Sequence, residues 1–205
     1  KVSDHLLDPA WTDYSKRVLY TTHDVTGLLR EGPNAIAAML GNGWFNPLPL
    51  RMWGRINLRE HLIVGRPRLI SQLNIEYEDG TTQSVVTDDD WRVARGPILR
   101  NSVYLGEAYD ARRERPGWDL PDFDADGWAN ASLVTGPNAS SRQLGPPHAQ
   151  AVPPIRATAT LRPASVTEVR PGVFIFDMGQ NFAGWARLRV DGPRGATVTM
   201  RMGEL

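Results

Sequence analysis

Residues Asn42 to Asn46, with the sequence NGWFN, place an aromatic ring beside two side-chain amides. Asn-Gly is a strong turn signal, and a turn can hold the ring of Trp44 at the rim of a β-sheet. An exposed indole offers a flat platform for the C–H face of a sugar, whose hydroxyls then need a few convergent amide or charged partners. The densest cluster of such groups in the chain gives the candidate carbohydrate-binding residues: Trp44, Asn42, Asn46, Arg51, Trp53 and Asp13.

The aromatic residues also have a purely structural interpretation. Tryptophan is usually mostly buried, so Trp44 and Phe45 can simply close the end of a hydrophobic core. Seven tryptophans is a high number for 205 residues, and a role in the core or in ligand binding would account for it. Both interpretations stay open at this point.

Signals for a metal site are weak. Asp88, Asp89 and Asp90 could begin a calcium loop, but the glycine at its sixth position and the glutamate at its twelfth are missing, so a solvated turn fits better. The four histidines show no metal-ligand spacing. The chain has no cysteine, which excludes disulfides and thiolate metal ligands. We assign no metal ligand from the sequence.

Composition excludes several classes of partner. Lysine and arginine number 23 against 23 aspartates and glutamates, so the formal net charge is zero and neither nucleic acid nor an anionic membrane surface is indicated. No apolar run reaches the ~18 residues of a membrane span. Residues 1–11 lack the pattern of an export signal. The compartment, cytoplasmic or secreted, stays open.

Short β-rich segments bounded by glycine or proline must position these residues. Their spacing of ~8–12 residues predicts an all-β chain, with a jelly-roll or β-sandwich module followed by part of a second β-sandwich. One short helical turn is expected at residues 24–29. The expected strands are residues 17–22, 35–40, 69–77, 82–86, 98–105, 158–161, 165–169, 173–176, 185–190 and 196–202.

Five motifs, in order along the chain, carry a resemblance to bacterial α-L-rhamnosidases of glycoside hydrolase family 78. The first four motifs resemble the N-terminal β-sandwich module of these enzymes. The fifth resembles their next β domain. The motifs are LDPAWTDY at residues 7–14, YTTHDVT at 20–26, LGNGW at 40–44, GEAYDAR at 106–112, and FDMGQNFAGW at 176–185 with RMGEL at 201–205.

The resemblance implies a domain order and an activity. Residues 1–134 are expected to form the N-terminal module, 135–154 a linker rich in Gly, Pro, Ser and Asn, and 155–205 the β domain that precedes the catalytic (α/α)6 barrel. A first strand or two is expected before Lys1. The family hydrolyses terminal α-L-rhamnosides with inversion, and its catalytic barrel lies outside this chain. We therefore expect a non-catalytic portion that scaffolds the barrel of the same polypeptide and is inactive alone.

Glu107 and Asp110 are the most tempting carboxylates within the chain. An inverting glycosidase needs a general acid and a general base about 6.5–9.5 Å apart. The arginines at 112, 113 and 115 would lower the pKa values of both carboxyls, which disfavours a general acid. We predict structural ion pairs here and assign no catalytic residue.

Two alternatives to a scaffold follow from the resemblance. In some family members the N-terminal module binds L-rhamnose through a calcium ion beside an aromatic platform, so a calcium-assisted binding module is the first. A free-standing lectin-like domain is the second. The expected partner is a rhamnose-containing glycoside or polysaccharide, with calcium as the candidate cofactor.

Overall fold

The computed structural model describes residues 1–47, 51–52, 55–134 and 144–203. In this part of the chain the regular structure is almost entirely β, in six two-stranded sheets, and the one α-helix, α1 at Leu58–His61, has four residues. The all-β prediction is confirmed. Among the described residues, no helix has the length and apolar character needed to cross a membrane.

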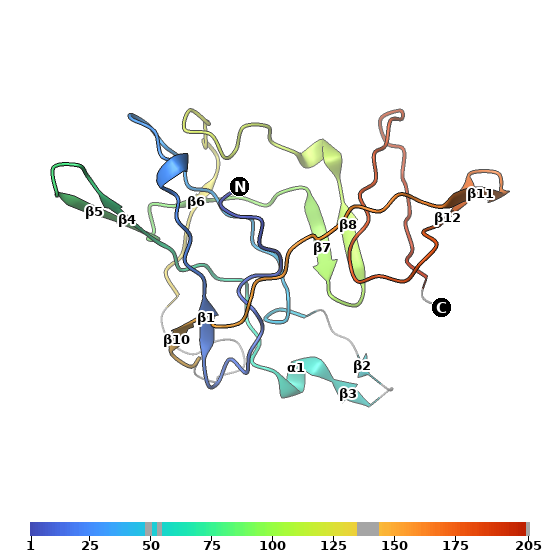
Figure 1. The fold of residues 1–205 in the computed structure, drawn as a ribbon, viewed down its shortest axis with the longest axis horizontal. Helices are drawn as coiled ribbons and strands as arrows, with labels where there is room; N and C mark the ends of the chain where they lie inside the picture. The colour runs from blue at the N-terminus through green and yellow to red at the C-terminus, as the bar shows by residue number, and fades with distance from the viewer. Residues whose placement is uncertain (48–50, 53–54, 135–143, 204–205) are drawn as a thin grey trace. The chain divides into compact units, whose positions relative to one another are not determined.

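The chain divides into two compact units. The smaller unit contains Lys1, residues 3–8 and residues 154–205, and the larger contains Val2 and residues 9–153. In the larger unit β2 pairs with β3, β4 with β5, and β7 with β8, all antiparallel (Figure 1). The β6 strand pairs with β9, also antiparallel. Its elements are β1 Val18–Tyr20, η1 Thr26–Leu28, β2 Arg51–Met52, β3 Ile56–Asn57, α1, β4 Gln72–Glu76, β5 Thr82–Val86, β6 Arg92–Val93, β7 Ile98–Ser102, β8 Gly106–Tyr109, η2 Ala111–Arg113, β9 Ala129–Asn130 and β10 Pro147–Ala149.

The β4–β5 hairpin follows directly from its sequence. Gly80 has φ +79°, a conformation that glycine adopts without steric cost. The carboxylate of Asp79 accepts hydrogen bonds from the backbone N–H and the hydroxyl of Thr81, at 2.9 and 2.6 Å, and so closes the turn. Along β4, Leu73 and Ile75 are half-buried while their neighbours are exposed. The period-2 pattern therefore reports which face of the strand is covered.

The β1 and β10 strands form a parallel pair between the two ends of the larger unit. Val18 aligns with Pro147, and Tyr20 aligns with Ala149. Just before β10, the N–H of Gly145 donates to the carbonyl of Tyr14 at 2.7 Å. A Cβ at position 145 would overlap the backbone of Lys16, so only glycine fits this close approach.

The smaller unit contains one hairpin, β11 Ser165–Arg170 with β12 Val173–Asp177, among its described residues. Gly172 occupies the turn at φ +74°, and its N–H donates to the carboxylate of Glu168 at 2.8 Å. The sequence predicts both strands to within a residue or two. Every residue of both strands is exposed.

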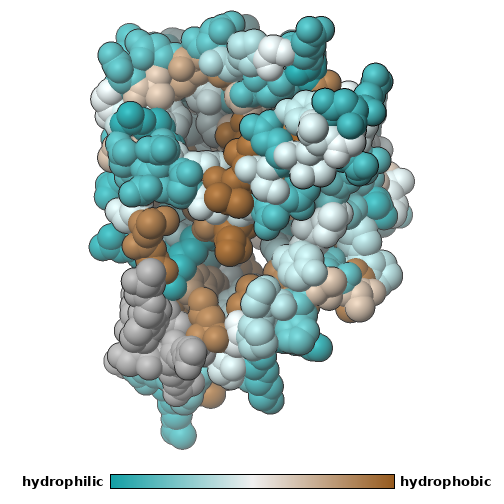
Figure 2. Space-filling model, turned by 90° about the vertical axis from the view of Figure 1, so that its left-hand side faces the viewer, coloured by the Kyte–Doolittle hydropathy of each residue, from teal (hydrophilic) through white to brown (hydrophobic). Residues whose placement is uncertain are grey.

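Burial is concentrated in one short segment of the larger unit. Ile63 and Val64 are 4% and 5% exposed and are the buried hydrophobic side chains among the described residues. The N–H of Gly65 donates to the carbonyl of Phe45 at 2.8 Å, which ties this segment to the aromatic loop. Elsewhere many hydrophobic side chains remain accessible, and Figure 2 shows such side chains among hydrophilic ones on one face of the molecule.

Several predicted strands are wrong. Residues 35–40, 158–161, 185–190 and 196–202 form no strand in the structure. A strand needs a neighbour that accepts its backbone hydrogen bonds, and an apolar run does not specify one. Just after residues 35–40, the backbone N–H of Asn42 donates to a side chain and not to a neighbouring strand: its acceptor is Oδ1 of Asn101, at 2.9 Å.

The domain ranges 1–134, 135–154 and 155–205 stay predictions. Residues 135–143 of the expected linker lie outside the described residues. The remainder of that segment includes β10, which is paired with β1. The two compact units divide between residues 153 and 154 and assign residues 3–8 to the smaller unit.

Candidate carbohydrate-binding site

Three aromatic rings gather around the predicted loop. The indole of Trp44 stacks on that of Trp11, with ring centroids 4.8 Å apart and planes 18° apart. The ring of Tyr104 meets Trp44 edge-on, with centroids 5.6 Å apart. Trp44 is half-buried, whereas Trp11 is 49% exposed. Tyr104 is 48% exposed, so solvent reaches Trp11 and Tyr104 more readily than Trp44.

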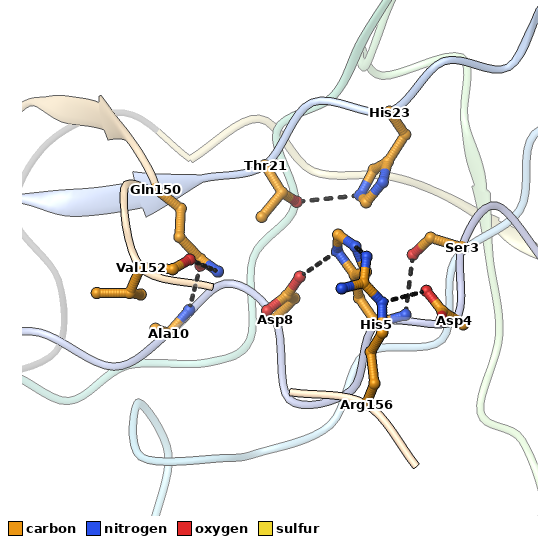
Figure 3. Close-up of polar contacts among 10 residues, drawn as sticks. All are labelled: Ser3, Asp4, His5, Asp8, Ala10, Thr21, His23, Gln150, Val152 and Arg156. Carbon is orange, nitrogen blue, oxygen red and sulfur yellow. Dashed lines mark hydrogen bonds and ion pairs between the residues drawn. The ribbon is translucent and has the colours of Figure 1, made fainter. Parts of the chain in front are cut away.

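Local hydrogen bonds position the two indoles. Gly43 has φ +49°, and the N–H of Asn46 donates to the carbonyl of Asn42 at 2.9 Å, which forms the turn that carries Trp44. On the other loop, the N–H of Ala10 donates to Oε1 of Gln150 at 2.8 Å, next to Trp11 (Figure 3). Both aromatic residues sit on loops held by side-chain amides.

The amides of Asn42 and Asn46 bond to other protein groups. Nδ2 of Asn42 donates to the carbonyl of Asn101 at 3.0 Å, and Oδ1 of Asn42 accepts from Nδ2 of Asn46 at 2.7 Å. Oδ1 of Asn46 accepts from the guanidinium of Arg59 at 3.1 Å. These bonds give both amides a role in holding the loop, and their role toward a sugar stays a prediction.

Asp13 lies beside Trp11 in a hollow of about 400 Å³, whose other lining residues are Thr12, Lys16 and Arg17. Its carboxylate accepts from the hydroxyl and the N–H of Ser15, at 2.6 and 3.0 Å. These hydrogen bonds hold the pKa of Asp13 below its usual value. The carboxylate is thus ionised at neutral pH and stands next to an exposed indole.

The structure places the remaining predicted residues less completely. Arg51 lies in β2, paired with Asn57, and its side chain lies outside the described part. Trp53 lies outside the described residues. Sequence reasoning left out Trp11 and Tyr104, and the high tryptophan count was the signal that pointed to further aromatic partners.

The carboxylate of Asp110 forms the predicted ion pair. Arg112 donates to both of its oxygens at 2.8 Å, and Asp110 also accepts from the N–H of Arg112 at the start of η2. The Arg112 hydrogen bond lowers the pKa of Asp110 to about 2. Glu107 lies in β8 opposite Asn101. A carboxyl held ionised in this way is unsuited to act as a general acid.

The described part of the chain contains no group of three or more His, Cys, Asp or Glu side chains placed to hold a metal ion. The N–H of Asp90 donates to the carboxylate of Asp88 at 3.1 Å, which is the hydrogen bonding of a turn. Asn130 donates to the carbonyl of Asp89 at 3.0 Å. Calcium binding stays a prediction from the family resemblance.

A separate polar cluster lies within the smaller unit (Figure 3). Nη2 of Arg156 lies 2.9 Å from Nε2 of His5, and Nδ1 of His5 lies 2.7 Å from the carboxylate of Asp8. Arg156 also pairs with Asp4 at 2.9 Å. Together with the backbone bridge between Leu6 and Ile155, these contacts tie residues 4–8 to residues 155–156.

Two known domain families match this chain. The model of the α-L-rhamnosidase N-terminal domain matches residues 1–159, and the model of the bacterial α-L-rhamnosidase concanavalin-like domain matches residues 167–205. The chain belongs to the α-L-rhamnosidase N-terminal domain family.

Two α-L-rhamnosidases align in sequence with almost the whole chain. The α-L-rhamnosidase of Streptomyces avermitilis is 42% identical over 100% of the chain, and that of Alteromonas sp. is 36% identical over 97%. The chain spans only 19% and 20% of the lengths of these two relatives.

Solved α-L-rhamnosidase structures support the fold. The enzyme of Dictyoglumus thermophilum matches with a TM-score of 0.72 at 38% identity, over 88% of this chain and 18% of its own. The S. avermitilis enzyme, crystallised with L-rhamnose, matches with a TM-score of 0.69 at 36% identity, over 88% of this chain and 16% of its own. The predicted β-sandwich class is confirmed.

Proposed function

We propose that this chain is the non-catalytic β portion of an enzyme that hydrolyses terminal α-L-rhamnosides, and that it scaffolds the catalytic domain of the same polypeptide. The observation that carries the proposal is the ordered match of two rhamnosidase domain models over residues 1–159 and 167–205. The chain covers about a fifth of each relative's length, which is consistent with a scaffolding role beside a separate catalytic domain.

The direction of the pKa shift at five aspartates is consistent with a non-catalytic role. Among the described residues, the aspartates whose pKa departs from its ordinary value are all lowered by hydrogen-bond donors: Asp4, Asp13, Asp24, Asp79 and Asp110. A glycosidase acid needs a raised pKa so that it holds its proton near neutral pH. These aspartates have the opposite environment.

The test measures release of L-rhamnose from an aryl α-L-rhamnoside by the polypeptide that carries this chain and by the 205-residue chain alone. We expect turnover by the first, with the product first appearing as the inverted anomer by NMR, and none by the second. Turnover by the chain alone that Asp110→Asn abolishes would contradict the proposal.

A second candidate function is sugar binding at Trp11 and Trp44. The observation that favours it is the exposed indole of Trp11, stacked on Trp44 and next to the ionised Asp13. An indole face can receive the methyl and C–H groups of a rhamnose ring, and Asp13 can accept from its hydroxyls. A carboxylate is also a ligand that calcium prefers.

Calorimetric titration with L-rhamnose, with and without calcium, tests this second function. We expect a Kd of about 0.1–1 mM, which corresponds to roughly 4–5.5 kcal/mol. Trp11→Ala should abolish binding, while the control Trp185→Ala, an exposed tryptophan of the smaller unit, should not. Absence of binding at millimolar sugar in both conditions leaves the scaffold role alone.

A further inference from the structure

A second hollow of the larger unit is lined mainly by arginine. It has a volume of about 400 Å³, and its lining residues are Arg95, Arg112, Arg113, Glu114 and Arg115. Ligand sites for small molecules begin at about this size. None of these residues belongs to the predicted sugar site around Trp44.

The β7–β8 hairpin brings the two sides of this hollow together. Ile98 at the start of β7 aligns with Tyr109 at the end of β8. One step further out, the N–H of Asp110 donates to the carbonyl of Pro97 at 2.9 Å. The loop that holds Arg95 therefore runs beside the turn that holds η2. Arg95 shares the hollow with three arginines that follow it by 17 or more positions.

The arginines differ in how fully they are paired. Arg112 is committed to Asp110 through two bonds of 2.8 Å, whereas Arg113 lies 3.7 Å from the same carboxylate. Arg115 lies over the ring of Trp128, 5.4 Å from its centre. Within the described part of the chain, Arg95 makes no ion pair. Positive charge thus remains uncompensated in the hollow.

The one carboxylate that lines the hollow is itself engaged. Glu114 accepts a hydrogen bond from the hydroxyl of Tyr109, and this contact raises the pKa of Tyr109 to about 12. The contact turns Glu114 toward β8, and the C-cap of η2 fixes its backbone. The donors of Arg95 and Arg113 are left to meet an incoming anion.

We infer that this hollow binds the acidic group, a carboxylate or a sulfate ester, of a charged saccharide. The planar guanidinium donates two parallel hydrogen bonds to such a group and is weakly hydrated, which suits it to an exposed anion site. The choice of a saccharide rests on the proposed function, because the family acts on glycosides. Arg95 and Arg113 hold the anion, and Arg112 with Asp110 positions the loop.

Titration of the 205-residue chain with four probes at low salt tests the inference: a methyl glucuronide, a sulfated rhamnoside, neutral L-rhamnose and inorganic sulfate. We expect at least one charged saccharide to bind, and to bind about tenfold more weakly to the double variant Arg95→Ala/Arg113→Ala. Arg30→Ala is the matched control, because Arg30 is also exposed and its side chain makes none of the described ion pairs.

Three results would overturn the inference: no binding of either charged saccharide, equal binding of inorganic sulfate, or binding that survives the double variant. Which charged probe binds identifies the acidic group. Rhamnose release from a neutral aryl rhamnoside by the whole polypeptide should be unchanged in the double variant. If the whole polypeptide without any substitution released no rhamnose, that result would instead refute the proposed function.

Discussion

The β4–β5 and β11–β12 hairpins share their turn chemistry and differ in their surroundings. Both turns use a glycine at positive φ, and in both an acidic side chain accepts a backbone N–H. One face of β4 is half-buried, whereas β11 and β12 are exposed along their whole length. Local sequence is thus sufficient to form a hairpin, but burial of its face depends on residues far away in the chain.

The largest expected effect separates the buried segment of the larger unit from the exposed hairpin. Ile63→Ala should lower the free energy of unfolding by about 2–5 kcal/mol, because it removes buried methylene groups and leaves a cavity. Ile175→Ala in β12, where the side chain is 55% exposed, should cost less than about 1 kcal/mol. Urea denaturation measures both, and equal losses would erase the distinction between the two regions.

Substitution of Gly145 tests whether the stability of the larger unit depends on the contacts between its first and last segments. Gly145→Ala should destabilise the unit by about 1–3 kcal/mol, because a Cβ there would overlap the backbone of Lys16. Gly27→Ala, where a Cβ would meet open space, is the control and should be nearly neutral. Hydrogen exchange at β1 and β10 provides the readout; unchanged protection in Gly145→Ala would contradict the prediction.

The amide network below the aromatic loop should contribute less. Asn42→Ala removes the side-chain hydrogen bonds to the carbonyl of Asn101 and to Nδ2 of Asn46 and should cost about 1–2 kcal/mol in thermal unfolding. Asn74→Ala on β4 is the comparison: it also removes two hydrogen bonds, from Gln72 and Ser84, but these are exposed to water and should cost less. If Asn42→Ala changed neither the free energy of unfolding nor the fluorescence of the stacked tryptophans, the loop would not need these bonds.

The smallest expected effect depends on pH. The pKa of Asp110 is lowered to about 2, so its ion pair stabilises the fold above the ordinary aspartate pKa of 3.8 and loses this contribution as the pH falls toward 2. Wild type should therefore melt above Asp110→Asn at neutral pH, and the difference should shrink steadily as the pH falls from 3.8 toward 2. A difference that stays constant down to pH 2 would assign the effect to shape rather than charge.

The sequence predicts the hairpins well because their signals are local. Residues 82–86 are β5 as predicted, since an Asp-Gly turn and alternating side chains specify both the turn and the register. Residues 35–40 are as apolar as a buried strand but pair with no strand among the described residues. Their hydropathy alone does not tell which distant segment is present to pair with them.

The same limit explains the candidate site. The turn at Asn42 and the aromatic ring beside it are readable from five neighbouring residues. Trp11 joins the site from a loop 33 positions earlier, and Tyr104 joins from the turn between β7 and β8. The Asp110–Arg112 pair was predictable because both partners lie on one short turn.

The parallel pairing of β1 with β10 sets an order of events during synthesis. The hairpins can close as soon as their own residues leave the ribosome, since such ladders form within microseconds. Val18 must wait for Pro147, and Ala10 for Gln150, so β1 stays unpaired while the residues between it and β10 are synthesised. The entropic cost of closing so long a loop rises by only about 0.6 kcal/mol for each doubling of its length. The delay, more than the free energy, exposes this strand to chaperones and to aggregation.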